Sequence, residues 1–277
     1  MKAPYNLKER ITESISSMPA LILKALVVLS LLYLLLAAYA LLVSDSMIFH
    51  PEYSRDPDPP GAFKIGCADG ALISAVHLPN YTARFILLFS YGNASSLGNS
   101  YEFLQWLHSQ GFSVFGYDYR GYGGSRGKPS ENALYADIDA AYGYLTDSLK
   151  VPPERIIAFG QSLGGAAAVD LASRRKLGAL IVESSFVSAF RVMTKIPLLP
   201  FDKFNSIRKI GRVTCPVLVI HGDSDRTIPL WHGQALFRAA RSPKKLLVVP
   251  GGDHNYVPEE YSEDYEKALR GFAASIK

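Results

Sequence analysis

From residue 61 onward, short runs of apolar residues alternate with longer segments in which apolar residues recur every three or four positions. Near-continuous apolar runs are typical of strands covered on both faces of a sheet, and the longer spacing is typical of amphipathic helices. The predicted strands lie at 64–67, 71–78, 84–90, 112–119, 155–160, 179–183, 216–222 and 244–250, and the predicted helices at 97–110, 130–149, 163–176, 230–241 and 258–275.

This alternation predicts an α/β fold. Strands separated by helices pair in parallel through right-handed crossovers, so we expect a mostly parallel central sheet with helices on both faces. A turn at Asp69-Gly70 predicts that the first two strands form an antiparallel hairpin at one edge.

A different pattern precedes this domain. Residues 25–43, ALVVLSLLYLLLAAYALLV, carry no charge and are almost wholly apolar. At about 1.5 Å per residue, such a helix is long enough to cross a hydrocarbon core of about 30 Å. Pro19 suits the first turn of a helix and Ser17 suits its cap. We therefore predict a single transmembrane helix at 20–43 after a short segment at 1–19.

Two alternatives to an anchor fit parts of this segment. A cleaved signal peptide is suggested by Ala38-Tyr39-Ala40, which resembles a cleavage site. The apolar run is longer than a usual signal core of about 7–15 residues, however, and it continues through Val43. A buried core helix is disfavoured because the segment is apolar on every face.

The flanks of the apolar run predict its orientation and its connection to the domain. Lys2, Lys8 and Arg10 precede it, which favours a cytoplasmic N-terminus and a main domain on the non-cytoplasmic side. Four prolines in residues 51–60 indicate a stiff linker. We thus divide the chain into a cytoplasmic segment at 1–19, an anchor at 20–43, a Pro-rich linker at 44–60 and a folded domain at 61–277.

The composition of the chain mainly argues against certain partners and cofactors. Apolar residues make up 48% of the chain and charged residues 19%, as expected of a folded protein, and the net charge of +4 is small. Without a dense basic patch, nucleic acid is not the expected partner. Cys67 and Cys215 lack the spacing of a metal or redox site, and no dinucleotide-binding fingerprint occurs, so no cofactor or metal is expected.

The pentapeptide G-x-S-x-G, which can mark the nucleophile of a serine hydrolase, occurs twice. Around Ser162 (GQSLG), a predicted strand leads in and a predicted helix leads out, and the flanking glycines let the two backbones come close. Around Ser125 (GGSRG), Lys128-Pro129 follows and disfavours a helix. We predict that Ser162 is the nucleophile and that Ser125 belongs to a loop.

A serine nucleophile needs a histidine base and an acid that orients it, in the chain order serine, acid, histidine. His254 lies in a Gly-rich loop after the last predicted strand, where that base is expected. Three acids are candidates, namely Asp223, Asp225 and Glu183, and position alone favours Asp225 without deciding between them.

An oxyanion hole requires two backbone donors. The N–H of Leu163, directly after the nucleophile, is the first candidate, and the N–H of Asn93, in the loop after an earlier strand, is the second.

Six segments together carry a family resemblance: MIFHP, SYGNA, YDYRGYGGSRGKPSE, FGQSLGG, CPVLVIHGDSD and GGDHN. Over residues 45–277 the chain resembles membrane-anchored serine hydrolases of the α/β-hydrolase superfamily, in the branch that includes depalmitoylase-like proteins. The resemblance implies that Asp225 is the acid and that Ser125 lies in a family loop. The family usually has His-Gly-Asn where this chain has Tyr91-Gly92-Asn93, and Tyr91 is a candidate lining residue of the acyl or leaving-group pocket.

The expected activity is hydrolysis of a carboxylic ester or thioester through an acyl-serine. The anchor and the apolar stretch IPLLPF at 196–201, interpreted as a small cap or a packed crossover, suggest a lipid-like or acylated substrate. A peptidase or amidase with the same residues and a non-catalytic binding protein remain alternatives. The sequence predicts no oligomeric state.

Overall fold

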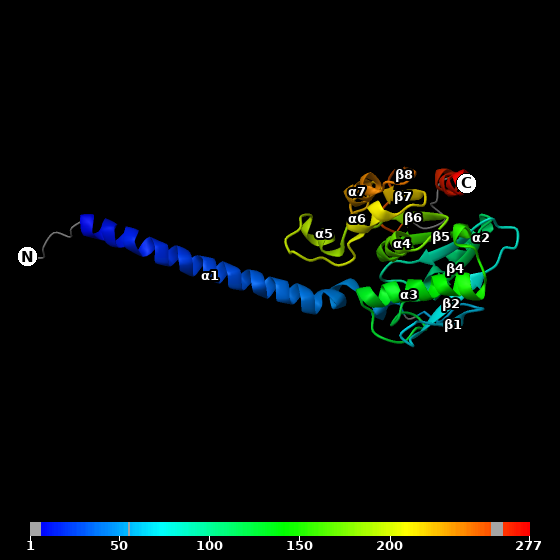
Figure 1. Cartoon of the computed structure of the whole chain (residues 1–277), viewed down its shortest axis with the longest axis horizontal. Coiled ribbons are helices and arrows are strands. Elements are labelled where there is room, and N and C mark those ends of the chain that lie inside the picture. Colours follow the sequence, from blue (N-terminus) through cyan, green and yellow to red (C-terminus); the bar gives the residue numbers. More distant parts are fainter. Residues whose placement is uncertain (1–6, 55, 256–262) are drawn as a thin grey trace, which may run out of the picture. The chain divides into compact units, whose positions relative to one another are not determined.

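The computed structural model describes residues 7–54, 56–255 and 263–277, with side chains from residue 20 onward. The chain divides into two compact units, Met1–Met47 and Ile48–Lys277 (Figure 1).

The described residues of the first unit form one helix. Helix α1 extends over Leu7–Ile48 and contains an 18-residue stretch with a mean hydropathy of 2.7, none of which is buried against protein. Its length and composition make it a candidate for crossing a membrane. The prediction that a helix begins near Pro19 was wrong. The preceding residues include good helix formers such as Leu, Lys, Glu and Arg, so the helix continues through the proline.

The segment after α1 is packed against the folded unit. Pro51–Tyr53 forms a 3₁₀ turn, and the side chains of Phe49, Ser54 and Pro59 are buried. The backbone N–H of Gly123 donates to the carbonyl of Ser54 at 2.8 Å. Residues 44–60 therefore differ from the predicted stiff linker: the first five continue α1, and the later prolines lie along the domain surface.

The second unit is built on an eight-stranded sheet with the order β1-β2-β4-β3-β5-β6-β7-β8. Strands β1 and β2 are antiparallel, and all pairs from β4 to β8 are parallel, which confirms the predicted edge hairpin and mostly parallel sheet. The strands are β1 (Phe63–Gly66), β2 (Leu72–Leu78), β3 (Ile86–Ser90), β4 (Ser113–Tyr117), β5 (Ile156–Gln161), β6 (Ala179–Glu183), β7 (Val217–Gly222) and β8 (Lys244–Val249).

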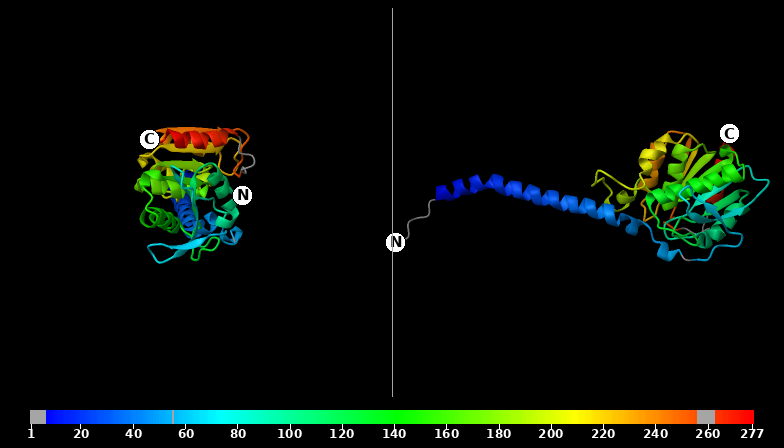
Figure 2. Two further views of the ribbon diagram at one scale, coloured as in Figure 1. Left: turned by 90° about the vertical axis from the view of Figure 1, so that its right-hand side faces the viewer. Right: turned by 60° about the horizontal axis from the view of Figure 1, so that its bottom comes forward.

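Helices cover both faces of this sheet (Figure 2). The helices of the second unit are α2 (Leu97–Ser109), α3 (Glu131–Gly143), α4 (Leu163–Arg174), α5 (Ala189–Thr194), α6 (Ser206–Lys209), α7 (Trp231–Ala239) and α8 (Glu263–Ser275). The predicted helix at 130–149 begins after its Ser130 cap, as expected, but ends at Gly143 and continues as a π turn, Tyr144–Ser148. The predicted start of the last helix, at 258, lies outside the described residues.

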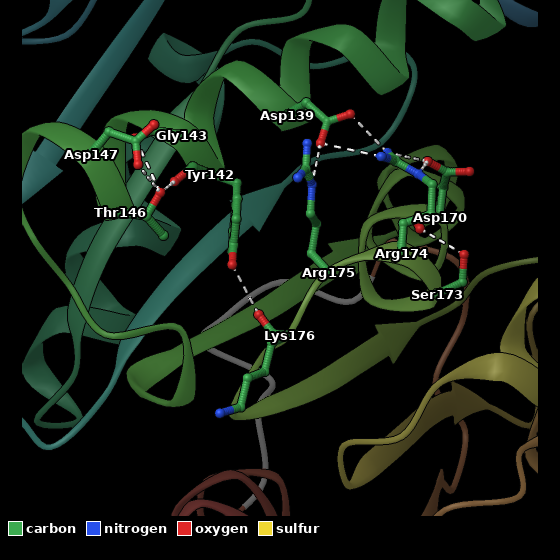
Figure 3. Close-up of polar contacts among 10 residues, drawn as sticks. All are labelled: Asp139, Tyr142, Gly143, Thr146, Asp147, Asp170, Ser173, Arg174, Arg175 and Lys176. Atoms are coloured by element: carbon green, nitrogen blue, oxygen red, sulfur yellow. Dashed lines mark hydrogen bonds and ion pairs between the residues drawn. The ribbon is translucent and has the colours of Figure 1, made fainter.

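The outer surfaces of α3 and α4 are joined by an ion-pair cluster (Figure 3). Arg174 lies 2.9 Å from Asp139 and 2.6 Å from Asp170, and Arg175 lies 3.2 Å from Asp139. Because both arginines are more than a third exposed, each pair contributes little to stability.

The sheet brings the predicted functional residues together at the carboxyl ends of its parallel strands. Asn93 follows β3, Ser162 follows β5, Asp225 follows β7 and His254 follows β8. Parallel strands end at the same edge, and in open α/β sheets the crevice outside the carboxyl ends is where ligands bind.

Candidate active site

Ser162 occupies a strained turn between β5 and α4. Its backbone has φ 51° and ψ −117°, a conformation that costs a residue with a β-carbon about 1–3 kcal/mol. Two contacts stabilise the turn from the β6 side. The Ser162 N–H donates to the Glu183 carbonyl at 2.9 Å, and the Ser185 hydroxyl donates to the Ser162 carbonyl at 2.7 Å.

The glycines on either side of Ser162 are needed for close backbone contacts. A β-carbon on Gly160 would overlap the Gly164 carbonyl, and one on Gly164 would overlap the Ser90 carbonyl at the end of β3. Strand β5, helix α4 and strand β3 therefore meet at this turn with no room for a methyl group.

His254 lies between Ser162 and Asp225. Its Nε2 is 3.1 Å from Ser162 Oγ, and its Nδ1 is 2.8 Å from Asp225 Oδ2. The Asp225 side chain is fully buried, whereas the His254 side chain is 14% exposed. The structure thus brings together three residues that are far apart in the sequence, with the imidazole oriented toward the serine hydroxyl.

The Asp225 carboxylate is surrounded by donors. Its Oδ1 accepts hydrogen bonds from the N–H groups of Thr227, at 2.9 Å, and Ile228, at 2.7 Å. Burial alone opposes ionisation, but the contacts with His221, His254 and the Ile228 N–H hold the pKa of Asp225 well below its usual range. This carboxylate is ionised at neutral pH and remains available to orient His254.

The other two acid candidates lie elsewhere. Asp223 Oδ1 accepts a hydrogen bond from the Gly251 N–H at 2.8 Å, so this carboxylate ties the loop after β7 to the turn after β8. Glu183 is buried and accepts hydrogen bonds from Gln161 Nε2, at 3.2 Å, and from the Tyr265 hydroxyl. Burial raises the pKa of Glu183 to about 7. Neither carboxylate forms a hydrogen bond with His254 among the described residues.

Ser125 is part of a buried backbone network. Its hydroxyl accepts a hydrogen bond from the Ser74 N–H at 2.8 Å and donates to the Asp118 carbonyl at 3.3 Å. It thereby joins the loop after β4 to strand β2, as expected of a structural serine.

The loop between β3 and α2 lies beside Ser162. A β-carbon on Gly92 would be 3.4 Å from the Ser162 β-carbon. Within the described parts of the chain, the N–H groups of Asn93 and Leu163 have no hydrogen-bond acceptor. Leu163 is also the first residue of α4, where N–H groups lack partners within the helix and the helix dipole favours negative charge.

Tyr91 lies in the core, so it does not line an acyl or leaving-group pocket. Its side chain is 1% exposed, and its hydroxyl donates to Asp118 Oδ1 at 2.6 Å. The Tyr119 hydroxyl donates to the Tyr91 carbonyl at 2.6 Å. Tyr91 is held in the core because the chain after β4 places the buried carboxylate of Asp118 opposite its hydroxyl. Burial raises the pKa of Asp118 to about 6.

Several supporting residues were missed by sequence reasoning. His221 lies 3.5 Å from Asp225 Oδ2, and the Ser185 hydroxyl donates to the Ser162 carbonyl, yet neither residue was predicted to belong to the site. The position of His221 four residues before Asp225 was the available signal. Nothing in the local sequence indicated that Asp118 would contact Tyr91.

A cavity lies at the amino ends of the parallel strands, away from Ser162. It is lined by residues near the amino ends of β3, β4 and β5, including Phe85, Ser113 and Arg155. In the described part of the chain, no three His, Cys, Asp or Glu side chains are grouped closely enough to hold a metal ion.

Fold and site geometry are those of an α/β-hydrolase, and comparisons with known proteins agree. Residues 81–201 match the serine aminopeptidase S33 family. The chain is 46% identical over 201 residues to α/β hydrolase domain-containing protein aho-3 of Caenorhabditis elegans, covering 70% of this chain and 58% of that protein. It is 41% identical over 228 residues to human α/β hydrolase domain-containing protein 17B, covering 80% and 77% of the two chains.

Solved structures show the same fold. An esterase of Pyrococcus furiosus superposes with a TM-score of 0.68 at 17% identity, covering 80% of this chain and 97% of the esterase. A monoacylglycerol lipase of Paleococcus ferrophilus superposes with a TM-score of 0.60 at 19% identity, covering 74% and 99%. The chain belongs to the family of the α/β hydrolase domain-containing 17 proteins, within the serine hydrolases.

Proposed function

We propose that this chain hydrolyses carboxylic esters or thioesters through an acyl-serine formed on Ser162. The observation that carries the proposal is the continuous contact from Ser162 Oγ through the His254 imidazole to the Asp225 carboxylate. A serine hydroxyl is a weak nucleophile unless an adjacent base takes its proton.

In the first half of the reaction, His254 Nε2 accepts the proton of Ser162 as Oγ attacks the substrate carbonyl. The ionised Asp225 holds the imidazole and stabilises the imidazolium that forms. The N–H groups of Asn93 and Leu163 donate to the oxyanion. As the carbonyl re-forms, His254 gives its proton to the departing alcohol or thiol, and the acyl group stays on Ser162.

In the second half, water replaces the leaving group. His254 accepts a proton from the water as its oxygen attacks the acyl carbon, and the same two N–H groups hold the second oxyanion. Collapse of this intermediate returns the proton to Ser162 and releases the acid. With the substrate and one water molecule, these steps balance.

The substrate class we propose is lipid-like or acylated, as the family resemblance to depalmitoylase-like proteins implies. The segment after β6 supports it, because Met193, Ile196 and Leu198 expose their apolar side chains there, at 78%, 59% and 49%. These side chains provide an apolar surface for an acyl chain.

For the anchor, we propose that residues 20–43 of α1 span the membrane, with residues 1–19 cytoplasmic and the hydrolase domain on the other side. The support is the apolar stretch of α1 and the lysines and arginine that precede it. Protease protection in sealed vesicles tests this orientation, and digestion of the domain from the cytoplasmic side contradicts it.

The chemistry is tested by labelling with a fluorophosphonate probe. Ser162→Ala should abolish labelling, whereas Ser125→Ala, its matched control in the other pentapeptide, should still be labelled. Labelling of the Ser162→Ala variant would sink the assignment. A panel of p-nitrophenyl esters from acetyl to palmitoyl then measures chain-length preference, and higher kcat/KM for the longer chains is expected.

A peptidase or amidase is the second candidate, favoured by the match of residues 81–201 to a family described as serine aminopeptidases. Turnover of an acyl ester and of the amide with the same acyl group separates the two. We expect the ester to be cleaved faster, and preferential cleavage of the amide would favour the peptidase.

A further inference from the structure

The side chain of Asn93 is anchored by the residue at which α1 ends. Its amide Nδ2 donates a short hydrogen bond to the main-chain carbonyl of Ile48, 45 residues earlier. Both residues belong to the unit that starts at Ile48. The proposed oxyanion loop is therefore bound to the segment that enters the domain.

The described residues of that entering segment, 48–54 and 56–60, are themselves fixed along the domain. The His50 N–H donates to the Tyr122 hydroxyl at 3.0 Å, and Phe49 packs edge-on against Phe204 with ring centroids 5.9 Å apart. Further along, the Ser96 hydroxyl donates to the carboxylate of Asp56 at 3.1 Å. We call residues 48–60 the entry strap.

The loop between Tyr91 and Asn93 is held at both ends by different parts of the chain. Tyr91 is bound to Asp118 and Tyr119 at the end of β4, through contacts of 2.6 Å each. Asn93 is bound to the strap through its side chain. Gly92, between them, has no side chain with which to restrain its own backbone.

An oxyanion donor works only when its N–H is already aimed at the place where negative charge develops. A peptide plane next to a glycine rotates easily, so the direction of the Asn93 N–H depends on what holds Asn93. The carbonyl of Ile48 supplies that restraint without occupying the N–H itself.

We propose that the entry strap is a positioning element of the active site, which orients the backbone N–H of Asn93 through the hydrogen bond between Asn93 Nδ2 and the Ile48 carbonyl. This inference rests on the proposed hydrolase function and assigns a role in turnover to residues that precede the first strand.

The test uses full-length protein and two variants. Asn93→Ala removes the anchoring amide and keeps the backbone N–H. Tyr122→Phe removes the hydroxyl that accepts the His50 N–H and so loosens the strap without changing the loop. Asn80→Ala is the control, since the Asn80 side chain holds only its own turn through Thr82, before β3.

Asn93→Ala should lower kcat roughly 10- to 100-fold, because a misaimed donor forfeits much of what an oxyanion donor supplies, with KM within about threefold of wild type. Binding of a boronic acid, which mimics the tetrahedral intermediate, should weaken by a similar factor. Tyr122→Phe should change both quantities in the same direction but less, and Asn80→Ala should change neither. Melting temperatures show whether each variant is folded.

If both variants are folded and keep the kcat and the boronate affinity of the wild-type protein, the inference is overturned. The proposed function still holds in that case, provided that the wild-type protein is active and Ser162→Ala is inactive. A rise in KM with unchanged kcat also overturns the inference, because the strap then contacts substrate instead of positioning a donor. A wild-type protein that neither turns over esters nor is labelled overturns the proposed function, and the inference with it.

Discussion

Gly164 and Ser90 are in direct backbone contact: a β-carbon on the glycine would overlap the carbonyl oxygen of the serine. The glycine is the second residue of α4, and the serine ends β3. This contact joins the turn that carries Ser162 to the strand that leads into the proposed oxyanion loop, so the two halves of the proposed site share one backbone junction.

Gly164→Ala should therefore damage both stability and activity. The added methyl group has backbone on its far side and nothing flexible to displace, so we expect a loss of about 1–3 kcal/mol, as for other overpacked sites, and near-complete loss of ester hydrolysis. Gly271→Ala is the matched control, because Gly271 lies in α8 with open space around it. It should be neutral or gain up to about 1 kcal/mol. Urea unfolding measures the stability of each variant, and initial rates measure its ester hydrolysis. If Gly164→Ala matches the wild-type protein in stability and rate, the contact between Gly164 and Ser90 is contradicted.

Asp225→Asn should lower kcat by about 10³- to 10⁴-fold while leaving the fold intact. An amide cannot stabilise the imidazolium, and it favours the wrong tautomer of His254. Asp223→Asn, two residues away, is the comparison: its carboxylate holds Gly251, so we expect a lower melting temperature and nearly full kcat. If the two variants exchange these phenotypes, Asp223 is the acid.

Tyr91→Phe should destabilise the protein by about 1–3 kcal/mol, because it removes a buried donor to Asp118. The loss should be larger at about pH 8 than at about pH 5. The pKa of Asp118 is raised to about 6, so the carboxylate needs the donor mainly above that pH. Tyr142→Phe is the control, since its hydroxyl contacts the Lys176 carbonyl at the edge of the α3–α4 cluster (Figure 3). Equal, pH-independent losses in both variants would count against the Asp118 contact.

Glu183→Gln should change how stability depends on pH. A carboxyl whose pKa rises on folding, here from 4.5 to about 7, binds its proton more tightly in the folded state. The stability that the Glu183 carboxyl contributes is fully present below about pH 4.5 and is lost as the pH rises through about 7. Relative to wild type, the variant should therefore gain stability across that interval, by on the order of 3 kcal/mol in total.

Denaturant unfolding at several pH values checks this prediction. Glu263→Gln provides the comparison, because its side chain is 81% exposed, and its difference from wild type should stay within about 0.5 kcal/mol. A Glu183→Gln difference that stays flat between about pH 4.5 and 7 would show that the buried carboxyl does not titrate there.

The sheet and its order of elements were predictable because each strand is a short apolar run and each helix has its own periodicity. The predictions were wrong where the neighbouring sequence, or contacts with the domain, overrode a local rule about proline. Pro19 normally marks a helix start, but helix formers on both sides carry α1 through it. The prolines of residues 51–60 suggested a stiff linker, whereas hydrogen bonds from Gly123 and Ser96 hold that segment to the domain.

The positions of Ser162 and His254 were predictable because chain order and strand ends constrain them, whereas the choice of Asp225 as the acid rested on the family resemblance. The environment of Tyr91 was not predictable, because its partner Asp118 lies 27 residues away and only the parallel pairing of β3 with β4 brings them together. The strap contact of Asn93 was equally hidden: it involves a backbone carbonyl, which any residue at position 48 supplies.

The contact between Asn93 and the Ile48 carbonyl determines what proteolysis of the entry strap would do. A protease cutting within residues 48–60 would sever the domain from the apolar helix and, in the same event, release the carbonyl that restrains Asn93. The freed domain would still carry Ser162 beside His254, yet it would turn over slowly: a latent hydrolase. Cleavage in the strap would then silence the enzyme instead of spreading its activity.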